Sequence, residues 1–235
     1  MSCSAWARAR ALRREAHDVA GELTAAEGLG RVTRRHVAEP ALALPHYYDA
    51  AAMAAALGER RTEGRLRNVI GILEYQRGSY PAALAQYELA LGAFTTCDDA
   101  HAIGLALNSI GATLRAMGRH ADARESLARA LAHNEAAGQP ELLGHTLGML
   151  GAVEMDAGLP DRAVPFLERS LAIRVEHGDR RGEGWMRYEL SRAAAAGSMR
   201  DRARTMLESS AHAARDSGDT ELHDACERLR RTAGL

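Results

Sequence analysis

The 235-residue sequence contains no lysine, and all 30 of its basic residues are arginines. Its 31 acidic residues leave a formal net charge of −1, so the bulk charge favours neither a nucleic acid nor a membrane as a partner. Arginine offers forked, bidentate contacts to carboxylates and phosphates. We attribute the missing lysine to the codon bias of a GC-rich bacterial genome.

Cysteine is also scarce. Cys3, Cys97 and Cys226 lie far apart, and an odd, sparse set argues against a disulfide framework and favours a reducing compartment. The N-terminus carries arginines but lacks the apolar segment of a signal peptide. No stretch is long and apolar enough to span a membrane. The sequence therefore predicts a cytoplasmic protein.

Aromatic residues make up only 4% of the chain and prolines number six, whereas hydrophobic residues make up 46%. Runs of alternating β-branched residues, which indicate strands, are few. Alanine, leucine and glycine dominate instead, and small residues suit closely packed helix pairs better than one large core. We therefore expect an all-α protein.

What the sequence does contain is an internal repeat. The same landmarks return at a constant 40-residue spacing, without insertions, and such a fixed period predicts stacked supersecondary units that form a solenoid. The recurring sets are Gly71, Gly111, Gly151 and Ser191; Gly78, Gly118, Gly158 and Ser198; Ala83, Ala123, Ala163 and Ala203; and Tyr87, Leu127, Leu167 and Leu207.

These positions resemble the tetratricopeptide repeat (TPR) family. Its motif has a large apolar residue, then Leu-Gly, then an aromatic residue, and later an alanine with an aromatic residue four positions on. In the second repeat Leu107, the Ile110-Gly111 pair and Leu114 match the first half, and Ala123 begins the second half. The period of this chain is longer than the usual one of roughly 34 residues, and it is similar to that of the longer-helix variety of the family.

The sequence departs from the motif at several places. Glu74 and Glu154 stand where the aromatic residue is expected, and the usual terminal proline is absent. The resemblance nevertheless implies a right-handed solenoid of stacked antiparallel helix pairs. Its expected parts are a capping helix and a diverged repeat in 1–57, four repeats in 58–217 (about 60–96, 99–136, 140–176 and 180–216), and a capping helix in 218–235.

Local signals place some helix ends. Asp161 is expected to cap the second helix of the third repeat, and Asp219 or Thr220 to cap the last helix. Pro45 and Pro165 are expected in the first turns of second helices, where proline does least harm.

The sequence offers no catalytic constellation. Its ten histidines are scattered, HExxH is absent, and the serines lack the strand-turn-helix setting of a hydrolase elbow. His223 and Cys226 share a helical face, but further metal ligands are missing nearby. We therefore expect a protein that is not an enzyme and that has neither a metal nor another cofactor.

The resemblance also implies a binding surface, because the first helix of each pair in TPR proteins lines a concave groove that holds partner peptides. Four arginines of this groove face one acidic residue, Asp156, so the partner is expected to carry acidic residues or a C-terminal carboxylate. Transferred by register, the candidate peptide- or protein-binding residues are Arg35, Arg65, Asn68, Tyr75, Asn108, Arg115, Trp185 and Arg192.

Asn68 and Asn108 occupy the same place in successive repeats. An amide has both a donor and an acceptor, so it can hold a peptide backbone without reading side chains. The alternative is that these asparagines face solvent or bond a neighbouring helix. For Trp185 and Tyr188, packing under the last repeats is the favoured interpretation over ligand contact.

The leading hypothesis is a non-enzymatic TPR adaptor or scaffold that binds a segment of a partner protein in its groove. One alternative is a regulatory sensor whose groove takes a small peptide or effector and whose curvature then changes. Another is a non-catalytic subunit that controls a partner enzyme.

Overall fold

The computed structural model describes the backbone of residues 3–16, 18–36, 40–197 and 199–235, and their side chains apart from Cys3, 32–36, 40 and 41. These residues are helical throughout, joined by short turns, and no strand occurs among them, so the all-α prediction is confirmed. The chain divides into two compact units, 1–117 and 118–235. Each unit is described by itself.

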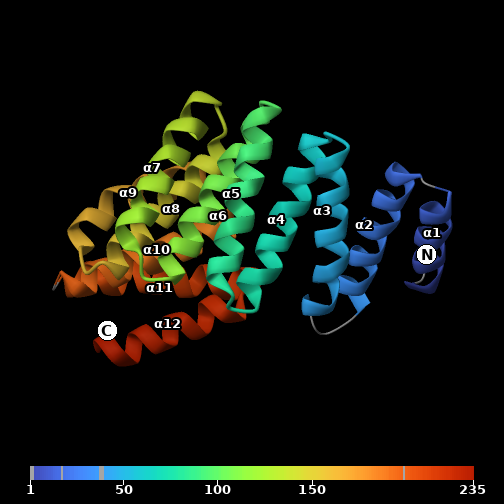
Figure 1. Cartoon of the computed structure of the whole chain (residues 1–235). Helices are drawn as coiled ribbons and strands as arrows, with labels where there is room; N and C mark the ends of the chain where they lie inside the picture. Colours follow the sequence, from blue (N-terminus) through green and yellow to red (C-terminus); the bar gives the residue numbers. More distant parts are fainter. Residues whose placement is uncertain (1–2, 17, 37–39, 198) are drawn as a thin grey trace. The chain divides into compact units, whose positions relative to one another are not determined.

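The first unit begins with α1 (Cys3–Glu15) and α2 (Val19–His36). A short 3-10 helix (Pro40–Ala43) leads into α3 (Leu44–Ala56), which is followed by α4 (Arg60–Gln76), α5 (Tyr80–Thr96) and α6 (Ala100–Ala116) (Figure 1). The second unit contains α7 (His120–Ala136), α8 (Pro140–Asp156), α9 (Pro160–Glu176), α10 (Arg180–Ala196), α11 (Arg200–Ser217) and α12 (Thr220–Ala233). Within each unit, successive helices pack against one another in antiparallel pairs, as expected for a helical-repeat protein.

The turns between helices share one backbone conformation. A residue with positive φ recurs at a constant spacing, and glycine supplies it at 58, 78, 118, 138, 158, 178 and 218, with φ between 61° and 78°. At the end of α8, for example, Gly158 is the residue with positive φ. The amide of the next residue, Leu159, donates to the carbonyl of Glu154 at 2.9 Å, as in a Schellman motif. Asp98 takes this place at the end of α5, with φ of 51°.

The landmark glycines inside the helices have a different task. A Cβ atom on Gly71 would lie 2.6 Å from the ring of Tyr87, and one on Gly151 would lie 2.4 Å from Leu167. Glycine therefore lets the two helices of a pair approach closely while the larger residue fills the space beside it. The four landmark alanines are fully buried in the same packing: Ala83, Ala123, Ala163 and Ala203.

Two details of the expected helix ends are wrong. Asp161 does not cap α9, because Pro160 takes the first helical position and Leu159 the cap position, without a side-chain bond. Asp161 lies in the first turn, where a negative charge still favours the helix dipole. Pro165 lies inside α9, beyond its first turn, whereas Pro45 is at the start of α3 as expected.

The cap of the last helix is confirmed at one of its two expected positions. Asp219 precedes α12 and its carboxylate accepts a hydrogen bond from the amide of Leu222 at 3.0 Å.

Among the described residues, none of the helices combines the length and the apolar character that a membrane crossing requires.

Candidate functional site

Arg65, one of the candidate cations of the first unit, is an exposed residue of α4 that already has an ion-pair partner. Its Nη1 and Nη2 atoms donate to the two carboxylate oxygens of Glu27 on α2, at 2.8 and 2.9 Å. These bonds hold the pKa of Glu27 below its ordinary value, and they raise the pKa of Arg65. Arg65 is thus held in a fixed orientation with much of its charge neutralised.

Two further candidates, Asn68 and Tyr75, follow Arg65 along one face of α4, with Ile72 between them, at helical spacings of three and four. Asn68 is partly buried, and its Oδ1 atom is buried without a hydrogen-bond partner among the described residues. Ile72 and Tyr75 are 37% and 36% exposed. The ring of Tyr75 lies 5.2 Å from that of Tyr80 on α5. This face therefore places an amide, whose acceptor atom is buried and unsatisfied, next to exposed apolar surface.

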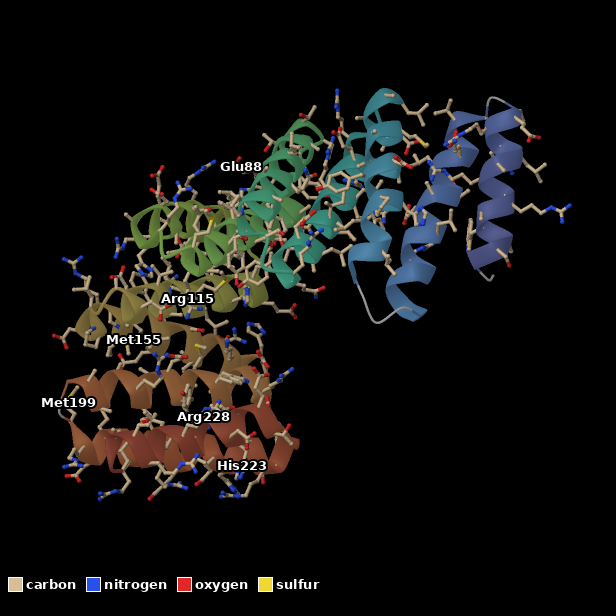
Figure 2. All side chains as sticks on the ribbon, turned by 60° about the horizontal axis from the view of Figure 1, so that its bottom comes forward. Glu88, Arg115, Met155, Met199, His223 and Arg228 are labelled. Carbon is tan, nitrogen blue, oxygen red and sulfur yellow. The ribbon has the colours of Figure 1, made fainter. Side chains whose placement is uncertain are left out.

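The corresponding face of α6 carries Leu105, Asn108 and Arg115. Leu105 is 38% exposed, whereas Asn108 is only 3% exposed and so belongs largely to the packed interior. Arg115 lies in the last turn of α6, partly exposed, and is labelled in Figure 2. The two asparagines share a register position, as the sequence indicates, but they differ in accessibility.

The remaining first-unit candidate is Arg35. Its backbone belongs to the last turn of α2, but its side chain lies outside the described residues.

The two second-unit candidates are held by local contacts. Trp185 donates from Nε1 to Asp219 Oδ2 at 3.2 Å and meets the ring of Tyr188 edge-on at 5.8 Å. Both aromatic rings pack against the buried cluster around Leu222. Arg192 donates to Glu189 at 2.7 Å.

The expected basic surface is therefore moderated by acidic neighbours that the sequence analysis did not identify. Glu27 lies 38 residues before its partner Arg65. The same separation recurs in the opposite sense, where Arg61 pairs with Asp99 at 3.1 Å and Arg181 with Asp219 at 2.8 Å. A separation of 38 residues was the sequence signal that could have revealed these pairs. It falls just short of the repeat period, so it places one side chain on a first helix and the other on, or directly before, a neighbouring helix.

His223 and Cys226 share a face of α12, but they are not joined by further side chains, among the described residues, that could complete a metal site. Cys226 is buried with its Sγ atom 3.3 Å from Ser210 Oγ, and burial raises the pKa of its thiol. Among the described residues, three or more histidine, cysteine, aspartate or glutamate side chains do not come together in a way that could hold a metal ion.

Solved structures with similar folds share little sequence with this chain. BtubC (BKLC) from P. vanneervenii superposes with a TM-score of 0.76 at 17% identity, covering 93% of this chain and 91% of that one. Aspartyl phosphate phosphatase F from Bacillus subtilis gives 0.81 at 14% identity, over 94% of this chain and 57% of that one. The Rap conjugation gene regulator of plasmid pLS20, solved with the Phr* peptide, gives 0.71 at 17% identity, over 94% and 60%.

At these identities the likeness shows the fold alone, and this chain spans less than two thirds of the last two proteins. Comparison with curated protein sequences gives no match. The sequence profile of the tetratricopeptide repeat matches residues 62–136 and, overlapping them, 101–174. These ranges cover nearly all of the helix pairs of the first three repeats, and residues 62–174 of this chain therefore match the tetratricopeptide repeat family.

Proposed function

We propose that this protein is a non-enzymatic TPR adaptor that binds a segment of a partner protein along the first helices of its repeats. In the first unit the recognition surface consists of Arg65, Asn68 and Arg115, together with the largely buried Asn108. The observation that carries the proposal is the buried Oδ1 atom of Asn68, which lacks a partner among the described residues. An unsatisfied buried acceptor is costly, so the amide of Asn68 would gain by turning outward to accept a hydrogen bond from a backbone N–H of a bound segment.

The neighbours of Asn68 support an extended peptide as the ligand. Ile72 and Tyr75 expose apolar surface on the same face of α4, which can cover a ligand side chain. The arginines would hold an acidic side chain or a terminal carboxylate through charge-assisted bonds. In the solved pLS20 regulator, a protein of the same fold is in complex with a peptide.

A displayed library of random short peptides, selected on the full chain, would supply a ligand for the test. Arg65→Ala and Arg115→Ala should each weaken binding by roughly 1.5–3 kcal/mol, and more strongly at low salt than at high salt. Asn68→Ala combined with Asn108→Ala should weaken binding at every salt concentration.

Arg129→Ala, which removes an exposed arginine from α7, is the matched control and should leave affinity unchanged. Calorimetry measures the affinities. If all three surface variants bind like the wild type, the ligand uses another face and the assignment is wrong.

A regulatory sensor is the second candidate, and the likeness to the peptide-bound conjugation regulator favours it. A sensor would change shape when it binds, whereas an adaptor would not need to. Small-angle scattering of the protein with and without a selected peptide distinguishes the two, because only the sensor should change its radius of gyration.

A further inference from the structure

Two helices of the chain carry the same pattern of charges. The triplet Arg-x-x-Glu-x-x-x-Arg opens α4 as Arg60, Glu63 and Arg67, and it opens α10 as Arg180, Glu183 and Arg187. In α4 the triplet is closed: Arg60 donates to Glu63 at 2.9 Å, Arg67 lies 3.7 Å from the same carboxylate, and Glu63 is only 7% exposed.

In α10 the corresponding triplet is open. Arg187 pairs with Glu183 at 2.6 Å. Arg180, however, makes neither a side-chain hydrogen bond nor an ion pair with any described residue. The same sequence pattern therefore leaves one guanidinium available in the fourth repeat but not in the first.

A hollow of about 330 Å³ lies beside this open triplet, between α10 and α11. Its α11 wall includes Ser209 and Ala213. At the corresponding positions of α9 stand Arg169 and Ile173, and the side chain of Ile173 reaches to within 3.2 Å of the place where a Cβ on Gly144 would lie. The hollow thus exists because the fourth repeat has small side chains where the third has large ones.

The charges around the hollow balance one another. Arg180 begins α10 and Asp216 lies in the last turn of α11, so in an antiparallel pair these opposite charges stand at the same end. Further along, Glu183 and Arg187 form the ion pair. Two arginines and two carboxylates therefore line the space, together with the hydroxyl of Ser209 and with His212, whose Nε2 atom lies 3.5 Å from Asp216 Oδ2. A ligand with one charge would leave an opposite charge uncompensated, whereas a zwitterion would match both.

We propose that this hollow is a binding site for a free α-amino acid. Its carboxylate faces Arg180, its ammonium group faces Asp216, and its side chain runs over Ala213 toward the Glu183–Arg187 pair. The two charged groups of an α-amino acid are attached to one carbon, which suits two opposite charges at one end of a slot. The volume lies at the small end of the range for ligand pockets, roughly 300–1,000 Å³, and so suits one amino acid better than a peptide.

This site is separate from the recognition surface proposed for the first unit, because it lies in the second unit, between α10 and α11. Its existence does not depend on that function.

The test uses the full chain and the standard L-amino acids, added singly at millimolar concentration, with thermal melting as the first readout and calorimetry as the second. At least one should raise the melting temperature and bind. Its deaminated and its decarboxylated counterparts should each bind at least tenfold more weakly. Equal binding of the deaminated compound would overturn the zwitterion assignment, and the absence of binding by every amino acid would overturn the site.

Variants then locate the binding. Arg180→Ala and Asp216→Asn should each weaken binding of that amino acid at least tenfold. Ala213→Ile, which places in α11 the residue that α9 has at this position, should abolish binding without lowering the melting temperature. Arg204→Ala and Asp224→Asn, which alter exposed charges elsewhere on α11 and α12, are the matched controls. Undiminished binding by Ala213→Ile would show that the ligand lies elsewhere.

Discussion

Arg124 of α7 binds the buried carboxylate of Glu154 on α8 with a two-pronged contact. The Nε atom donates to Oε1, and the Nη2 atom donates to Oε2 at 3.0 Å. Glu154 is 2% exposed and occupies the position at which the TPR motif has an aromatic residue. The hydrogen bonds to Glu154 raise the pKa of Arg124. A charged residue is tolerated inside the second unit because its partner comes from the adjacent helix.

Arg124→Ala should therefore destabilise the protein by roughly 2–3 kcal/mol, because it leaves a buried carboxylate without its partner. The loss of stability is smaller than for a fully buried ion pair, because the Arg124 side chain is 37% exposed. Glu154→Leu should cost less, since Leu114 fills the same register position in the second repeat. Urea unfolding followed by circular dichroism measures both. Equal stability of Arg124→Ala and the wild type would contradict the structural role of this pair.

The left-handed turn residues give a second prediction. Gly78 has φ of 78° and open space around its Cα, so Gly78→Ala should cost about 1 kcal/mol through backbone strain alone. Asp98→Gly should leave stability unchanged or raise it, because it relieves the same strain at φ of 51°. Melting temperatures test the pair. A stabilising Gly78→Ala would mean that the turn residue does not require positive φ.

A third prediction separates glycines that are needed for packing from those that are not. Gly151→Ala should destabilise by roughly 1–3 kcal/mol, because the new methyl group would overlap the fully buried Leu167. Gly92→Ala is the matched control, since open space surrounds that helical position. It should stabilise by up to about 1 kcal/mol through helix propensity. Gly111→Leu, at the same register as Gly151, should also destabilise. The reverse order in denaturant unfolding would contradict the assigned repeat register.

The Glu27–Arg65 pair predicts an acid dependence. Because the pKa of Glu27 lies below its ordinary value near 4.5, the stability contribution of the pair is fully present above that ordinary value. It is lost as the pH falls through the lower pKa of the folded state. Glu27→Gln should therefore flatten the stability profile below that ordinary value and cost at most about 1 kcal/mol at neutral pH, since Arg65 is exposed. Unfolding measured from about pH 3 to about pH 7 tests it.

The same substitution bears on binding. Glu27 competes with an incoming carboxylate for Arg65, so Glu27→Gln should strengthen binding of an acidic peptide selected on the wild type. Glu59→Gln, a change of an exposed acid in the same unit, is the control. Weaker binding by Glu27→Gln alone would indicate that the carboxylate positions Arg65 rather than competing for it.

The repeat was predictable from the sequence because the backbone conformation that recurs in each repeat requires particular residues at fixed positions. α4, α6, α8 and α10 begin at residues 60, 100, 140 and 180, and the glycines that permit turns and close packing recur with them. The turn residue Asp98 was not recognised by this pattern, because an aspartate can also adopt the positive φ that glycine supplies elsewhere. The misplacement of the α9 cap had a similar cause, since a proline at the first helical position competes with an aspartate as a start signal.

Side-chain pairing was less accessible to sequence reasoning. Register predicts that Arg65 lies on the groove face of α4, but not that Glu27 on α2 has a rotamer that meets it. The hollow beside Arg180 was also missed, because its signal is the loss of volume from Ile173 to Ala213 rather than the presence of a motif. Both features depend on comparing one repeat with the next.

The regular recurrence of the left-handed turn residue restricts how the length of this protein can change. One residue inserted into a helix rotates everything after it by about 100° around the helix axis, so an apolar face would turn away from its neighbour. A segment that begins and ends at equivalent turns, such as 140–179, has no such effect. Growth and shortening of this chain are therefore expected in whole repeats, by duplication or loss of a complete helix pair.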